Sequence, residues 1–273
     1  MTTLAHDVAG GVARRRRVAG IVRRDFYATR RNGGRIVEIL FWPVLELVIW
    51  GFVSVFLRAN NVPIAVSVLL GAVLLWQVVG RAQGDLAAMF LHDVWSRNLL
   101  NVFVSPLSLG EFLAGHVIFG AALLTANSLV MSGLALLLYG FGITTIGPAL
   151  VPFLVLLVAM GWGLGMVAIA VVIRFGESTQ SIAWVLAAAF QPFAAVFYPV
   201  SVLPPAAEAL AHAVPASHIF EGMRGVLAGQ GIDWSGLAVA AVLDVLLLAG
   251  ALTFLAHALR HARRTGRLSK FGE

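Results

Sequence analysis

The sequence predicts an all-α integral membrane protein with six transmembrane helices, and three observations support this fold class. Hydrophobic residues make up 60% of the chain and charged residues only 12%, a far more apolar balance than that of soluble domains. The mean hydropathy is +0.91. Apolar runs of about 20 residues, the length that a helix needs to cross a bilayer, recur along the chain, and most of its arginines flank these runs.

The first predicted element is an amphipathic helix within residues 1–35. Its arginine pairs recur every seven residues, which on a helix places them on one face, with Val18, Ile21, Val22 and Phe26 opposite. We expect this helix to lie in the membrane interface, where arginines attract anionic lipid. A further interpretation is that part of this helix also contacts a cytoplasmic partner. The arginines are Arg16, Arg17, Arg23, Arg24, Arg30 and Arg31.

The predicted transmembrane domain covers residues 36–260, and residues 261–273 form a cytoplasmic tail. Gln191–Pro192 predicts a kink in the fifth span. Gly161 and Gly165 form a small-xxx-small face on the fourth span, for packing within the chain or at a dimer seam. The six spans are residues 36–57, 64–80, 117–139, 147–173, 182–202 and 237–259.

The distribution of basic residues predicts the orientation. Of the 19 lysines and arginines, only Arg58 and Arg224 fall on the opposite side from the others. The positive-inside rule therefore places both termini in the cytoplasm, in agreement with an even number of spans in the cell (inner) membrane. Because the basic residues lie at membrane edges, we expect no nucleic-acid partner.

Residues 81–111, between the second and third spans, are longer than a simple connection requires. Leu86, Met89, Phe90 and Val94 have helical spacing, and polar residues then lead to a stop at Pro106. We predict two short helices at the inner face, which either dock a partner or only pack against the membrane.

A proline-broken stretch precedes the last span, over residues 190–227. It is too apolar for a water-exposed loop and too interrupted for one spanning helix. Irregular backbone at membrane depth is tolerated only where it is buried in protein or lines a watery cavity. We therefore expect this stretch, on the outer side, to mark a pathway or its gate.

Two acidic residues fall within predicted spans, namely Glu46 and Asp244. Because an exposed carboxylate is costly in lipid, both should face the bundle or a cavity, either for function or to anchor helices. Aromatic residues such as Trp50 and Phe197 could line a path, or form the aromatic belts common at membrane interfaces.

The sequence contains no pattern that predicts catalysis, so we expect no catalytic, cofactor-binding or metal-binding residues and no enzyme activity. It has no cysteine and no His-Glu-x-x-His pattern. A Walker A loop requires a lysine followed by serine or threonine, whereas the single lysine, Lys270, precedes Phe271. ATP hydrolysis would have to take place on another chain.

This layout resembles an ABC-2 type transporter permease, a family of six-span export subunits that includes drug, polysaccharide and nodulation-factor exporters. Three pieces carry the resemblance, which extends over about residues 12–270. They are the arginine-rich helix, the segment DVWSRNLLNVFVSPLSLGEFLAG, and FYPVSVLPPAAEALAHAVPASHIFEGMRGVL before the last span.

The resemblance implies roles for particular residues. Residues 93–103 would form a coupling helix in a cleft of an ATPase subunit, with an interface helix from the amino-terminal segment beside it. Residues 203–228 would form short re-entrant extracellular helices that cap the pathway. The coupling candidates are Asp93, Trp95, Ser96, Arg97 and Asn98. The pathway or cap candidates are Glu46, Phe197, Tyr198, Pro199, Pro204, His218, Glu221 and Arg224.

The resemblance also implies a homodimer with two copies of an ABC ATPase, which would carry the ATP and Mg. The predicted function is a permease subunit that moves an amphipathic drug, lipid or lipid-linked glycan out of the cytoplasm. The alternative is a self-contained proton-coupled carrier with Glu46 and Asp244 as its relay. Such carriers are built from internal repeats, and the two halves show no convincing one.

Overall fold

The structure, a computed structural model, describes residues 2–60, 63–95 and 107–265. Every regular element in these ranges is a helix, as the composition predicts. The α-helices are α1 Thr2–Arg31, α2 Gly33–Ala59, α3 Pro63–Trp95, α5 Leu109–Tyr139, α6 Leu150–Phe175, α7 Gln180–Phe190, α8 Pro205–His212, α9 Pro215–Leu227 and α10 Trp234–Arg264.

Five of the described helical segments are long and apolar enough to cross a membrane, which confirms a multi-pass membrane fold. They correspond to the predicted spans other than the fifth. These segments are Gly33–Ala59, Val66–Asp93, Leu109–Tyr139, Ile143–Phe175 and Trp234–Arg264.

The predicted fifth span, residues 182–202, is not one continuous helix. α7 has 11 residues and ends at Phe190, and turns follow it, with Ala195 at a φ of 52°. Pro192 has no amide hydrogen and restricts the residue before it, so it favours a helix end at this point. The kink expected at Gln191–Pro192 is therefore a termination of the helix.

α3 continues as a helix through residues 81–95, where the sequence predicted that the span had ended and a separate short helix began. Arg81 and Asp85 caused this error because charged residues lower the hydropathy. They lie one helical turn apart, and Arg81 Nη2 donates to Asp85 Oδ1 at 2.6 Å. This pairing allows both to lie in a helix that is otherwise largely buried.

α6 packs between α3 and α10 at the centre of the bundle. Its contact with α3 depends on glycine, because a Cβ at Gly161 would lie 2.6 Å from the Cβ of Ala82. At Gly165 a Cβ would lie 3.1 Å from the Gln83 carbonyl oxygen. The small-residue face therefore serves packing within the chain. Phe153, Leu157 and Phe220 are fully buried nearby.

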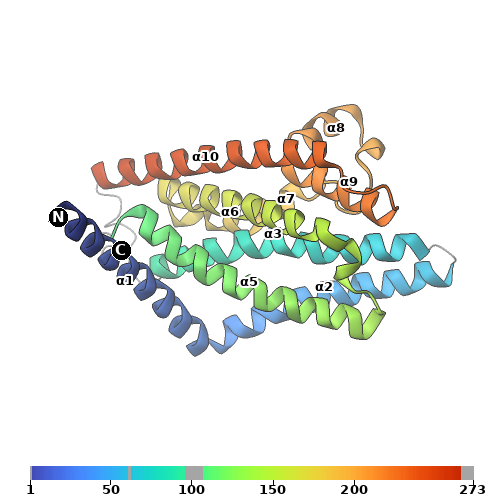
Figure 1. The fold of residues 1–273 in the computed structure, drawn as a ribbon, viewed down its shortest axis with the longest axis horizontal. Helices are drawn as coiled ribbons and strands as arrows, with labels where there is room; N and C mark the ends of the chain where they lie inside the picture. The colour runs from blue at the N-terminus through green and yellow to red at the C-terminus, as the bar shows by residue number, and fades with distance from the viewer. Residues whose placement is uncertain (1, 61–62, 96–106, 266–273) are drawn as a thin grey trace.

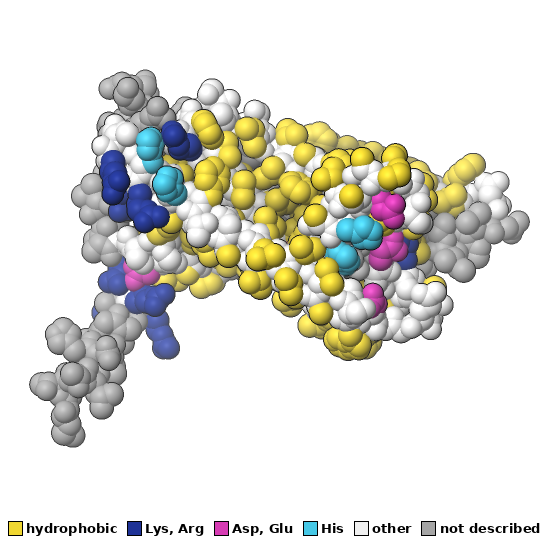
Figure 2. All heavy atoms as spheres, turned by 90° about the horizontal axis from the view of Figure 1, so that it is seen from above, with side chains coloured by type: hydrophobic (Ala, Val, Ile, Leu, Met, Phe, Trp, Pro, Cys, Tyr) yellow, Lys and Arg dark blue, Asp and Glu magenta, His cyan; other side chains and the backbone are white. Residues whose placement is uncertain are grey.

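The molecule has two polar ends separated by an apolar band. α1 crosses one end of the bundle obliquely and packs against α5, whereas α8 and α9 lie at the other end (Figure 1). Figure 2 shows most of the visible basic side chains gathered at one end, most of the visible acidic ones at the other, histidines at both ends, and mainly hydrophobic side chains between them. This division suits a protein surrounded by lipid.

Candidate functional site

The predicted coupling segment lies between the end of α3 and the start of α5. Asp93 is buried in the last turn of α3, and Trp95 is the final residue of that helix. Ser96, Arg97 and Asn98 lie outside the described residues. The structure therefore describes how the segment is held at each side.

α1 forms ion pairs with the helices on both sides of this segment. Arg24 Nη2 donates to Asp93 Oδ2 of α3 at 2.9 Å and to Asp25 Oδ1 at 3.1 Å. On the α5 side, Arg17 Nη2 donates to Glu111 Oε1 at 2.6 Å. One helix is thus joined by charge to both flanks of the coupling segment.

The start of α5 is fixed by local chemistry as well. The Ser108 side chain accepts from the Glu111 amide, and Glu111 Oε2 accepts from the Ser108 amide at 2.9 Å, which forms a capping box. One turn further on, His116 Nδ1 lies 2.6 Å from Asp25 Oδ2 of α1, and both residues are buried. We call Arg17, Arg24, Asp25, Asp93, Glu111 and His116 the ionic clamp.

The charge state of the clamp follows from its composition. Burial alone would lower the pKa of the Arg24 guanidinium, but the carboxylates of Asp93 and Asp25 outweigh this effect and raise that pKa above its ordinary value. Arg24 therefore remains a cation between two carboxylates. Charge-assisted hydrogen bonds of this kind are stronger than neutral ones.

The arginines of α1 consequently divide into two groups, and do not form one uniform face. Arg17 and Arg24 turn toward the protein, whereas Arg16, Arg23, Arg30 and Arg31 are exposed. Among the apolar residues, Ile21 is buried against α5, where a Cβ on Gly115 would lie 2.6 Å from the Ile21 Cβ. Phe26 is 48% exposed.

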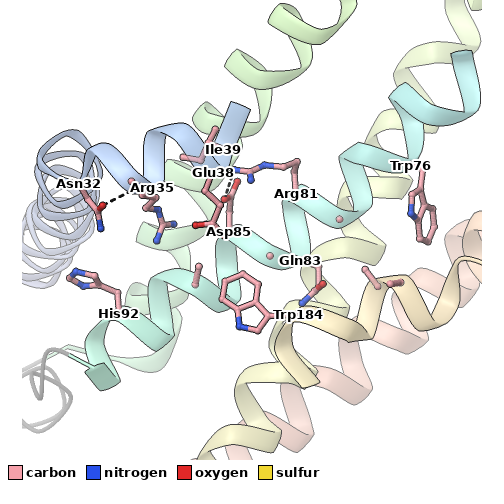
Figure 3. Close-up of a pocket in the computed structure, with 16 residues that line it drawn as sticks. Asn32, Arg35, Glu38, Ile39, Trp76, Arg81, Gln83, Asp85, His92 and Trp184 are labelled. Atoms are coloured by element: carbon pink, nitrogen blue, oxygen red, sulfur yellow. Dashed lines mark hydrogen bonds and ion pairs between the residues drawn. The ribbon is translucent and has the colours of Figure 1, made fainter. Parts of the chain in front are cut away.

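A second site is a polar cavity of about 660 Å³ between the start of α2, the middle of α3, and α7. Asn32 caps α2 by accepting from the Arg35 amide at 3.1 Å. Figure 3 shows Arg35 and Glu38 of α2 meeting the Arg81–Asp85 pair of α3 in this cavity, with Trp184 reaching in from α7.

These charged groups are incompletely paired within the described part of the chain. Nε and Nη2 of Arg35, Nε of Arg81 and Oδ2 of Asp85 are buried and make no hydrogen bond there. Buried polar atoms that lack a partner are costly, so their concentration in one cavity indicates a place that accepts water or a polar ligand.

A smaller cavity of about 220 Å³ extends the first one along α2 and α3. The two share Glu38, Trp76, Gly80 and Arg81, and the smaller one adds Trp42, Glu46, Gln77 and Gln191. Gln77 Nε2 donates to the Pro43 carbonyl oxygen at 3.1 Å, which links α3 to α2 at this level. Together we call these two cavities the polar groove.

The groove brings Glu46 together with residues that the sequence did not single out, namely Arg35, Glu38, Arg81 and Asp85. The signal that could have found them was the pair of opposite charges at Arg81 and Asp85, one turn apart beside an apolar run. Asp244 is elsewhere: it is buried in α10 and lines neither cavity of the groove, and both carboxylate oxygens lack a partner in the described structure.

Most of the predicted cap residues gather around the turns that follow α7. Glu221 Oε1 accepts from the Val200 amide at 2.6 Å, and Arg224 Nη1 donates to the Ala195 carbonyl oxygen at 2.9 Å. Arg224 Nη2 also lies 3.0 Å from Glu221 Oε1. α9 thus holds the irregular segment through one ion pair.

The remaining cap candidates have separate roles. Phe197 stacks on Trp50 of α2 with ring centroids 4.3 Å apart, and the Tyr198 hydroxyl donates to the Pro192 carbonyl oxygen at 2.7 Å. Pro199 and Pro204 precede the short helix Val200–Val202 and α8. His218 Nε2 lies 3.0 Å from the His212 carbonyl oxygen, which ties α9 to α8.

The described residues contain no group of three or more His, Cys, Asp or Glu side chains that could hold a metal ion. Comparison with curated proteins gives no match. The family model for the ABC-2 type transporter, however, matches residues 18–228, which include the polar groove, the predicted cap residues and every residue of the ionic clamp except Arg17. The chain therefore belongs to the ABC-2 type transporter family, whose members are membrane components that typically work with an ATPase partner.

Proposed function

We propose that this chain is the permease subunit of an ATP-driven exporter that moves an amphipathic substrate out of the cytoplasm. The ionic clamp is the observation that carries the proposal. α1 pairs with Asp93 on one side of the predicted coupling segment and with Glu111 on the other. A force applied to that segment by an ATPase would therefore reach α1, α3 and α5 together.

The polar groove supports an amphipathic substrate. Its charged and amide groups lie beside Trp42, Trp76 and Trp184, so one wall can meet a polar group and another an apolar ring or chain. The groove ends near Gln191, next to the turns held by α9. In the proposed cycle, substrate enters from the Arg35 level and leaves past the cap.

The proposed assembly is a homodimer with two copies of an ABC ATPase, which bind ATP and Mg. Within the described residues, the groove is lined by α2, α3, α7 and the residues that flank them, so a second copy would help to enclose it. In this assembly α7 and the turns after it form a sixth crossing, α8 and α9 are re-entrant helices on the outer side, and both termini lie in the cytoplasm at the inner membrane.

Co-expression with an ABC ATPase, followed by vesicle transport of amphipathic dyes, tests this function. We expect the ATPase to copurify and transport to stop when its Walker A lysine is replaced. Trp95→Ala and Arg97→Gln should reduce transport severalfold while the complex still hydrolyses ATP. Transport that persists with the inactive ATPase and collapses with the proton gradient would instead support a proton-coupled carrier.

A further inference from the structure

A wide apolar groove of about 1060 Å³ lies between α1 and α5, on the side of α1 away from the ionic clamp. Val18, Val22 and Phe26 form the α1 wall, and Ile118 and Phe119 lie on the α5 wall. Phe26 and Ile118 are about half exposed, at 48% and 52%. The packing of α1 against α5 therefore leaves a large apolar surface uncovered.

The rim of this groove is basic. Arg14, Arg15 and Arg23 line it, and within the described residues none of them has a carboxylate partner. The arginines that do have carboxylate partners, Arg17 and Arg24, belong to the ionic clamp. Three arginines without a carboxylate partner in the described structure therefore line the apolar groove, whereas Arg16, which is also exposed, lies outside it.

The dimensions of the groove match part of one membrane leaflet. Its α5 wall runs from Ala114 to Ala122, about 12 Å along a helix at the usual rise of 1.5 Å per residue. The hydrocarbon region of one leaflet is about 15 Å thick, half of the bilayer core. An acyl chain lying along this wall would place its headgroup among the arginines at the beginning of the span.

We propose that this groove is a binding site for an anionic phospholipid, with its phosphate among Arg14, Arg15 and Arg23 and an acyl chain along Ile118 and Phe119. The site goes beyond general attraction of a basic helix to the membrane surface, because it requires three particular arginines and an apolar wall. The lipid would occupy the open side of α1 and hold the helix in the position at which its other side forms the clamp.

A protein occupant accounts for these observations less well. An acidic surface of an ATPase could pair with the arginines, but it would leave the apolar walls in contact with water or require an apolar projection of its own. A phospholipid carries both an anionic phosphate and an apolar chain, and the adjacent α5 is a candidate membrane span.

Native mass spectrometry of the delipidated chain, titrated with phosphatidylglycerol or phosphatidylcholine, tests the site. We expect one phosphatidylglycerol per chain to bind at least tenfold more tightly than phosphatidylcholine. The variant R14Q/R15Q/R23Q should lose this preference. The control variant R16Q/R30Q/R31Q removes the same charge from the same helix but from residues outside the groove, and should keep it.

A second variant separates the site from the folding of α1. Ala114→Trp leaves every arginine in place but fills the apolar wall, and it should also abolish the tight binding. Equal losses in both arginine variants would show nonspecific attraction and overturn the proposal. Unchanged phosphatidylglycerol binding in R14Q/R15Q/R23Q together with loss of the ATPase would assign the arginines to the partner protein instead.

Discussion

The guanidinium of Arg24 lies 2.9 Å from the carboxylate of Asp93 and joins the middle of α1 to the last turn of α3. The Asp93 side chain is only 3% exposed, whereas that of Arg24 is 34% exposed. The desolvation cost of forming the pair therefore falls mainly on Asp93, which is buried beside a second carboxylate, Asp25. The positive charge of Arg24 compensates for this cost. The pair therefore fixes the end of α3 next to the predicted coupling segment.

Replacing Arg24 with glutamine should destabilise the protein, because the buried Asp93 would lose the charge-assisted hydrogen bond that Arg24 donates to it. Removal of a partner from a buried polar group costs about 1–3 kcal/mol. We expect a lower melting temperature and a loss of substrate-stimulated ATPase activity in the complex. The exposed Arg16→Gln is the matched control, and an equal effect from that variant would remove the special role of the Arg24–Asp93 pair.

The Asp25–His116 contact should respond differently from the Arg24 pair. His116→Asn places an amide near Asp25 and preserves a donor, whereas His116→Leu removes the donor and leaves the carboxylate without this partner. We expect the leucine variant to lose more stability, by about 1–3 kcal/mol relative to the wild type. Denaturation of both variants in the same detergent measures this order, and equal stability would contradict it.

The Arg81–Asp85 pair in the polar groove allows stability and function to be separated. Arg81→Leu alone leaves Asp85 buried without its partner, and breaking a buried pair in this way is strongly destabilising, by about 3–5 kcal/mol. Arg81→Leu combined with Asp85→Leu should restore much of that stability, because replacing a whole buried pair with apolar residues is often neutral. If the groove is the pathway, the double variant should still fail to transport, and normal transport would exclude these residues from it.

The positions of the long apolar helices could be predicted from the sequence because the length of an apolar run is a local property, but the end of α3 could not, because Arg81 and Asp85 interrupt the run. α7 could not be bounded, since apolar composition continues through Pro192 while the helix does not. The ionic clamp was also out of reach: Arg24 and Asp93 are 69 residues apart, and Arg17 and Glu111 are 94 apart. Local spacing shows which residues share one face of a helix. It does not show which acidic residue of another helix forms an ion pair with each arginine.

The cap candidates were identified from their sequence pattern. The hydrogen bonds that connect them, however, depend on the conformation of the turns after α7. Nothing in the local sequence indicates that Glu221 reaches the Val200 amide or that Arg224 reaches the Ala195 carbonyl. Ala195 has a positive φ, an uncommon conformation for a residue with a side chain. The backbone bend created there presents the carbonyl oxygen to Arg224.

Graded substitutions at Glu221 should show how the cap is held. Glu221→Gln retains an oxygen that can accept from the Val200 amide but loses the charge that pairs with Arg224. Glu221→Ala loses both interactions. We expect hydrogen exchange of the Val200 amide to rise severalfold in the alanine variant and less in the glutamine variant. Arg58→Gln, an exposed arginine of α2, is the control, and identical exchange in all variants would contradict the assignment.

Glycine 161 provides a test of the central packing that is independent of transport. A Cβ there would lie 2.6 Å from the Ala82 Cβ and 2.8 Å from the Val79 carbonyl oxygen, so α6 and α3 would have to separate. Overpacking of this kind typically costs about 1–3 kcal/mol, and we expect Gly161→Ala to lower the melting temperature. Gly133→Ala on α5 is the control, since no atom lies within 4 Å of its added Cβ. Because alanine is favoured over glycine within helices, the Gly133→Ala variant should be neutral or slightly stabilising. If the Gly161→Ala protein is as stable as this control, α6 does not approach α3 so closely.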